Sequence, residues 1–135
     1  MPKSNNWNVS YSAILFFEDL LNSNKKVLSF ERTDDIFFKI MRKSGLSSVN
    51  ALLINVYTVG LADVFRAKRE FPDLDCIVTS SIWNGYTIEA KEHALDSEIG
   101  LFVVSEFSSA LRERVPYLYV KRDRDGNPIY HFKSA

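Results

Sequence analysis

Cysteine is almost absent from the sequence, and this excludes two kinds of site. Cys76 is the only cysteine among the 135 residues, so the chain can form neither an internal disulfide nor a Cys-x-x-Cys metal site. Cys76 lies in the mainly apolar segment 75–78, where a free cysteine behaves as a small buried hydrophobic side chain. Neither His93 nor His131 is close to it in the sequence. We therefore expect Cys76 to be a core residue rather than a nucleophile.

Long apolar runs are also missing. No stretch approaches the roughly 18 apolar residues that a membrane-spanning helix requires. Segment 1–6 lacks the apolar region of a signal peptide. We therefore expect a cytoplasmic protein that does not associate with a membrane.

The sequence has no excess of charge of either sign. Its 17 lysines and arginines balance 17 aspartates and glutamates. No overall electrostatic attraction therefore draws the chain to a polyanion. Nucleic acid remains among the partners considered, but the net charge does not indicate it.

Glycine and proline are scarce, with 5 and 4 residues, and no segment has the composition of a flexible linker. The chain is 46% hydrophobic and 25% charged, as in an ordinary globular protein. A chain of this length forms one core. We expect a single domain over residues 1–135, with its core at about 11–111 and a tail at 116–135.

Helical and strand patterns alternate along the chain. Apolar residues recur at three- and four-residue spacing where we expect helices, and short apolar or alternating runs between turn residues predict strands. The expected helices are 11–21, 61–71, 87–95 and 105–114, and the expected strands are 27–32, 36–42, 51–57, 76–79 and 101–104.

The order of the core elements, αβββαβαβ, predicts an α/β fold with a mixed five-stranded sheet flanked by helices. The first three strands favour antiparallel pairing, and the later strand–helix–strand units favour parallel pairing with right-handed crossovers. Segment 51–57 is nearly continuously apolar, which is typical of a central strand covered on both faces. We therefore expect Leu53, and Val78 in the next strand, to be deeply buried.

The C-terminal tail has a different character. Segments 117–121 and 129–132 flank the turn-rich stretch 123–128, which predicts a β-hairpin. A lone two-stranded hairpin is marginal in water, so its apolar residues need a covering surface. We expect the tail either to pack on its own domain or to exchange with a second copy, forming a homodimer through the C-terminal hairpin.

The stretch 75–111 contains an apolar strand, a loop with Gly85-Tyr86-Thr87, the triplet Glu89-Ala90-Lys91, and then Ile99-Gly100-Leu101 before a terminal Phe107 and Leu111. This stretch, together with the element order over 11–111, resembles the restriction-endonuclease-like superfamily, the PD-(D/E)xK nucleases, and within it the Mrr-type subgroup.

The resemblance implies an active site that has lost its chemistry. The family's metal-binding acid falls on Asp35 or Asp34, and its (Asp/Glu/Gln)-x-Lys triplet falls on segment 55–57. Asn55 and Tyr57 would share a strand face, but neither supplies the anionic ligand or the cation of that triplet. We therefore expect no catalysis and no cofactor. The resemblance implies a nucleic-acid or protein interaction module.

An alternative is a divergent nuclease that binds Mg²⁺ and uses migrated residues. Lys39 shares a strand face with Asp35, Lys68 lies on the following helix, and Glu18 on the first helix could add a carboxylate. Against this, Thr-Asp-Asp at 33–35 is also good turn chemistry, because aspartate side chains accept hydrogen bonds from nearby backbone amides.

A further alternative is a small anionic ligand at the loop Trp83, Asn84, Gly85, Tyr86 and Thr87. This loop leaves a strand and enters a helix N-terminus, where backbone N–H groups can bind an anion, and its two aromatic rings could stack on a ligand. The structural reading is that Gly85 permits a turn, Thr87 caps the helix, and the two rings cover its edge.

Overall fold

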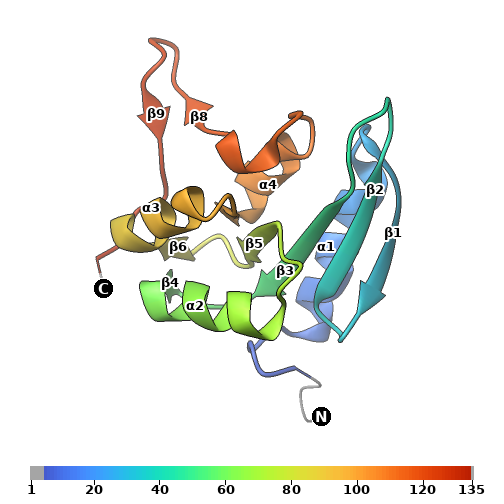
Figure 1. Ribbon diagram of the computed structural model, residues 1–135, viewed down its shortest axis with the longest axis horizontal. Helices are drawn as coiled ribbons and strands as arrows, with labels where there is room; N and C mark the ends of the chain where they lie inside the picture. Colours follow the sequence, from blue (N-terminus) through green and yellow to red (C-terminus); the bar gives the residue numbers. More distant parts are fainter. Residues whose placement is uncertain (1–4, 135) are drawn as a thin grey trace.

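The computed structural model describes residues 5–134, and Figure 1 shows how their elements are arranged. The helices are α1 (Tyr11–Ser23), α2 (Leu61–Glu70), α3 (Ile88–Asp96) and α4 (Val104–Ala110), followed by a short 3₁₀ turn, η1 (Pro116–Leu118). The strands of the main sheet are β1 (Val27–Thr33), β2 (Phe37–Arg42), β3 (Val49–Ile54), β5 (Cys76–Thr79) and β7 (Gly100–Val103).

The main sheet has the strand order β1-β2-β3-β5-β7. β1, β2 and β3 pair antiparallel, whereas β3, β5 and β7 pair parallel, with Leu52 opposite Ile77 and Ile77 opposite Leu101. The predicted mixed five-stranded sheet is therefore confirmed. The predicted burial of Leu53 and Val78 is also confirmed, because both residues are inaccessible to solvent.

Helices cover both faces of this sheet. Phe38 of β2 packs edge-on against Phe17 of α1, and Phe17 stacks on Phe107 of α4, so α1 and α4 lie on one face. Phe37, the neighbour of Phe38 in β2, stacks on Phe71 at the end of α2, so α2 lies on the opposite face. α3 packs beside α2 (Figure 1). Side chains alternate along a strand, and this alternation separates the two layers.

The predicted strand 51–57 is wrong at its C-terminal end, because β3 ends at Ile54. Asn55 donates from Nδ2 to the backbone oxygen of Asn8, and the Val56 amide donates to Oγ1 of Thr79. These bonds turn the chain out of the main sheet. It then forms β4 (Thr58–Val59), which pairs parallel with β6 (Gly85–Tyr86) in a second, two-stranded sheet that the sequence did not predict.

The predicted helix 105–114 is too long, since α4 ends at Ala110. The buried guanidinium of Arg42 donates to the backbone oxygens of Leu111 and Glu113, at 2.9 and 2.7 Å. Carbonyl groups beyond α4 are thereby satisfied by a side chain from β2 instead of by further helix.

The tail forms a shorter hairpin than predicted, from β8 (Lys121–Arg122) and β9 (Pro128–Ile129), which projects from the domain (Figure 1). Beyond it the chain returns to β6. The Tyr86 amide donates to the His131 oxygen (3.1 Å), and the Lys133 amide donates to the Tyr86 oxygen (2.9 Å). A Cβ at Gly85 would collide with the His131 backbone oxygen, so this approach requires glycine. The tail thus packs on its own domain, one of the two expected arrangements.

Among the helices of residues 5–134, none combines the length and the apolar character needed to cross a bilayer.

Candidate functional site

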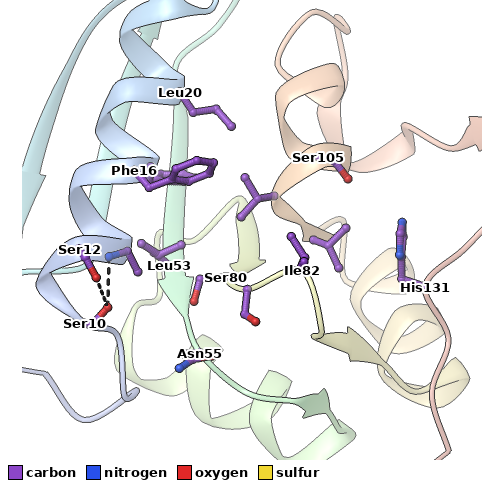
Figure 2. A pocket seen from close by; sticks show the side chains of 15 residues that line it. Ser10, Ser12, Phe16, Leu20, Leu53, Asn55, Ser80, Ile82, Ser105 and His131 are labelled. Atoms are coloured by element: carbon purple, nitrogen blue, oxygen red, sulfur yellow. Dashed lines mark hydrogen bonds between the residues drawn. The ribbon is translucent and has the colours of Figure 1, made fainter.

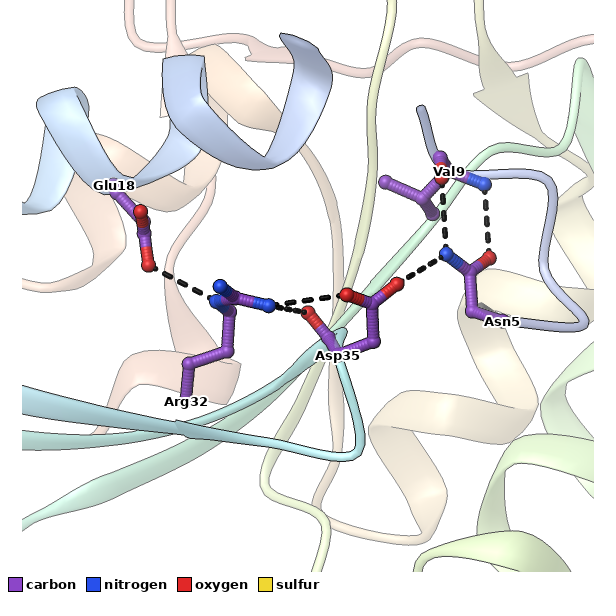
Figure 3. A network of polar contacts seen from close by, with 5 residues as sticks. All are labelled: Asn5, Val9, Glu18, Arg32 and Asp35. Carbon is purple, nitrogen blue, oxygen red and sulfur yellow. Dashed lines mark hydrogen bonds and ion pairs between the residues drawn. The ribbon is translucent and has the colours of Figure 1, made fainter. Parts of the chain in front are cut away.

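Two of the carboxylates proposed for a nuclease site meet at one arginine (Figure 3). Arg32 of β1 donates from Nε to Glu18 of α1 at 3.1 Å, and from Nη1 to Oδ1 of Asp35 at 3.0 Å. The other Asp35 oxygen accepts from Nδ2 of Asn5 at 2.8 Å. Glu18 and Asp35 therefore do converge, but a guanidinium stands between them.

An arginine, and not a metal ion, bridges the carboxylates of this network. A fixed cation already balances one of the two carboxylate charges, and Asn5 and Arg32 together engage both Asp35 oxygens. Asp34 and Asp35 have φ of 49° and 68°, the left-handed conformation that aspartate adopts in tight turns. Within the described part of the chain, no three His, Cys, Asp or Glu side chains are grouped so that they could hold a metal ion.

The other residues proposed for the nuclease site lie apart from this network. Lys39 is exposed on β2 and pairs across the sheet with Asn50. Lys68 of α2 points to α3, where it donates to Oγ of Ser97 at 3.1 Å. Tyr57 is 64% exposed and follows the end of β3, so Asn55 and Tyr57 do not share a strand face.

The loop from Trp83 to Thr87 has already used its backbone donors. The amides of Gly85 and Thr87 donate to backbone oxygens of the β4 region, and the Tyr86 amide donates to the tail. The Thr87 hydroxyl caps α3 by accepting from the Ala90 amide at 3.0 Å. Trp83 is 71% exposed, whereas Asn84 is buried. The backbone amides that would bind an anion at this loop therefore already donate to groups of the protein.

Asn84 joins this loop to the end of β3. Its Nδ2 donates to Oδ1 of Asn55 at 2.9 Å, to Oγ1 of Thr79 at 3.0 Å and to the Ser80 backbone oxygen. Asn55 and Asn84 were assigned to different candidate sites by the sequence, and the structure brings them together. Asn55 directly follows β3 and Asn84 lies shortly beyond β5, and the carboxyl ends of neighbouring parallel strands share one edge of a sheet.

A cleft of about 640 Å³ opens at this edge of the sheet, between α1 and α4 (Figure 2). Residues at or just beyond the carboxyl ends of β3, β5 and β7 form its floor, among them Leu53, Ser80 and Val103. One side of α1, as far as Leu20, and the first turn of α4 form two of its walls, and the tail contributes His131. Crevices outside the carboxyl ends of parallel strands are the usual binding position in open α/β sheets.

The lining of the cleft is mainly apolar, with some polar side chains. Apolar side chains line most of it, and the polar groups are serine hydroxyls, the Asn55 amide and the His131 imidazole. None of the described residues lining the cleft is Asp, Glu, Lys or Arg. The Nε2 atom of His131 is buried and has no hydrogen-bond partner among residues 5–134.

Exposed apolar side chains extend the cleft outward. Phe16 of α1 is 64% exposed and Ile82 is 89% exposed, and both line the cleft. Tyr11 at the start of α1 and Trp83 next to Ile82 are also largely exposed. Exposed apolar and aromatic side chains beside a cleft are typical of a binding surface.

A buried polar cluster lies under the tail, and the sequence analysis missed it. Lys91 of α3 donates from Nζ to the Leu101 oxygen at 2.6 Å and lies over the rings of Tyr86 and Phe102. Buried Glu106 accepts from the Tyr86 hydroxyl, at 2.9 Å to its nearer oxygen, and from the Val103 amide.

Burial dominates the electrostatics of this cluster. Desolvation lowers the pKa of Lys91 to about 8, although the negative charge of Glu106 opposes the change. Desolvation, and then the Glu106 carboxylate, raise the pKa of Tyr86 above its ordinary value. Burial also raises the pKa of the Cys76 thiol to about 12, which agrees with a core residue and not with a nucleophile. The sequence held one signal for the burial of Lys91: it lies next to Ala90, on the buried side of α3.

Comparison with known proteins finds no significant match, whether with protein-family models, curated proteins or solved structures.

Proposed function

We propose that this chain is a non-catalytic interaction module with a restriction-endonuclease-like fold, and that it binds apolar side chains of a protein partner in the cleft. The observation that supports this most is the cleft itself: it lies at the carboxyl ends of three parallel strands, and its lining is mainly apolar with some polar side chains.

The proposal excludes phosphodiester cleavage by this chain for a chemical reason. Such a site needs carboxylates free to bind a metal ion and a cation that stabilises developing charge. Here Arg32 occupies the space between Glu18 and Asp35, and the lysines Lys39 and Lys68 lie elsewhere.

The lining favours a protein over a nucleic acid as the partner in this cleft. Nucleic-acid affinity depends mainly on contacts between Lys or Arg and phosphates, and none of the cleft residues described here is Lys or Arg. The exposed rings and aliphatic side chains around the opening, including Phe16 and Ile82, are instead suited to a hydrophobic interface core.

A peptide selection tests the proposal. Random 12-residue peptides displayed on phage are selected on the wild-type chain and counter-selected on Ser105→Trp, which places a bulky ring at the cleft wall from an exposed position. Synthetic copies are then measured by fluorescence anisotropy. Ser29→Trp is the matched control, because Ser29 is exposed on β1 and lies outside the cleft lining.

We expect selected peptides to carry at least two apolar side chains. Ser105→Trp and Phe16→Ala should each weaken their binding at least tenfold, or about 1.4 kcal/mol, while Ser29→Trp changes it less than twofold. Peptides that bind all four proteins equally would contradict the cleft as the site.

A further inference from the structure

A second cavity, of about 400 Å³, lies between the C-terminal ends of α1 and α4. It is lined by Leu20, Ser23, Asn24, Lys25, Lys26, Ser108 and Arg112. Leu20 also lines the cleft, so the two openings adjoin at this residue along the same helix pair.

The cavity has a fixed frame. Asn24 caps the end of α1 and donates from Nδ2 to the Ser108 oxygen at 3.0 Å, which joins the two helix ends. Its Oδ1 accepts from the Lys26 amide at 3.0 Å, and the Lys43 amide donates to the Lys26 oxygen at 2.8 Å. These hydrogen bonds fix the backbone at Asn24 and Lys26.

The charge of this cavity is one-sided. Lys25, Lys26 and Arg112 line it, and none of its described lining residues is acidic. The ion pairs found in residues 5–134 involve only Arg32 and Arg66 as cations. None of the three cations of the cavity therefore takes part in an ion pair there. The C-terminal ends of two helices contribute at most about half a negative charge each. Three cations exceed that compensation and leave roughly two positive charges.

We propose that this cavity binds a phosphate group. A tetrahedral dianion matches the excess positive charge of Lys25, Lys26 and Arg112 in this lining. The site differs from the cleft in chemistry, because the cleft lining contains no Lys or Arg among its described residues. The phosphate could belong to a small free molecule or to a phosphodiester backbone.

The experiment uses two probes and two double variants. Pyrophosphate stands for the free molecule and a fluorescent ten-residue oligothymidylate stands for the backbone. Their affinities are measured by calorimetry and anisotropy at 20 mM and 150 mM NaCl. Lys26→Gln with Arg112→Gln removes two cations of the cavity. Lys39→Gln with Arg69→Gln removes the same charge from exposed positions outside its lining.

We expect at least one probe to bind the wild-type chain, and the cavity variant to bind it at least tenfold more weakly. Each unit charge at about 4 Å contributes roughly fivefold in a water-like dielectric. The control variant should stay within twofold. Binding of pyrophosphate alone identifies a free phosphate compound, and binding of the oligonucleotide alone identifies a backbone. Equal losses in the two variants, or no binding of either probe at 20 mM NaCl, would overturn the proposal. Melting temperatures of all three proteins verify that they are folded.

Discussion

The buried Lys91 makes the stability of this domain depend on pH in a way that one substitution can isolate. The Lys91 pKa lies at about 8 in the folded chain, against 10.5 for an unperturbed lysine. The unfolded chain therefore binds more protons on this group between pH 8 and 10.5, and the free energy of unfolding rises with pH over that window. Between pH 7 and pH 9 the Lys91 contribution should improve by about 1 kcal/mol.

Other groups titrate in the opposite sense at higher pH. The raised pKa of Cys76 and that of Tyr86 keep these groups protonated in the folded chain, so their contributions fall as the pH rises above their ordinary values. The comparison with Lys91→Met removes them, because both proteins share these groups.

Urea unfolding of the wild type and of Lys91→Met at pH 7, 8 and 9 is the assay. The difference in unfolding free energy should shift by about 1 kcal/mol towards the wild type from pH 7 to pH 9. Lys39→Met is the exposed control and should show no such shift. A Lys91→Met difference that stays constant within 0.3 kcal/mol, on the order of assay error, would refute a desolvated lysine.

The remaining predictions concern the core, catalysis and the tail. Leu53→Ala should cost about 2–5 kcal/mol in denaturant unfolding, through lost burial and a cavity, and a change under about 0.5 kcal/mol would contradict the central position of β3. Neither Mg²⁺ nor Mn²⁺ should support cleavage of single- or double-stranded DNA, and metal-dependent turnover abolished by Asp35→Ala would revive the nuclease alternative. Gly85→Ala should lower the melting temperature by several degrees, because its Cβ collides with the His131 oxygen. Deletion of 116–135 should lower it too, by uncovering Tyr86 and Phe102, and an unchanged melting temperature would refute that packing. Light scattering of the full-length chain tells intrachain packing from the proposed exchange, since exchange gives a dimer.

The fold was predictable because the strong patterns in this sequence are local. The three longer helices and all five strands of the main sheet follow from apolar spacing, and the parallel pairing follows from the helices between strands. The second sheet was not predictable. β4 and β6 have two residues each, and their pairing joins Thr58 to Gly85, so no local pattern announces it. β3 ends early for a similar reason: the chain leaves the sheet where Asn55 donates to the Asn8 oxygen and the Val56 amide donates to Thr79, and both partners are distant in the sequence.

The site was predictable only in part. The sequence proposed Glu18 and Asp35 for one site, and the structure places both at Arg32, which appeared in the sequence only as one more charged strand residue. The cleft was missed because its lining comes from five separate segments, and only the assembled sheet edge brings them together. The sequence analysis treated Lys91 only as part of a motif. Its burial could not be predicted, because it depends on the rings of Phe102 in β7 and Tyr130 in the tail.

The central claim is that the cleft binds apolar side chains, and chemical-shift mapping tests it most directly. An isotope-labelled wild-type chain is titrated with the tightest peptide from the selection. The account predicts that the largest amide shifts fall on the cleft lining at Ser12, Leu53, Ser80, Ser105 and His131, and that Ser105→Trp suppresses them. Shifts confined to the projecting hairpin, or to the exposed edge strand β1, would contradict it.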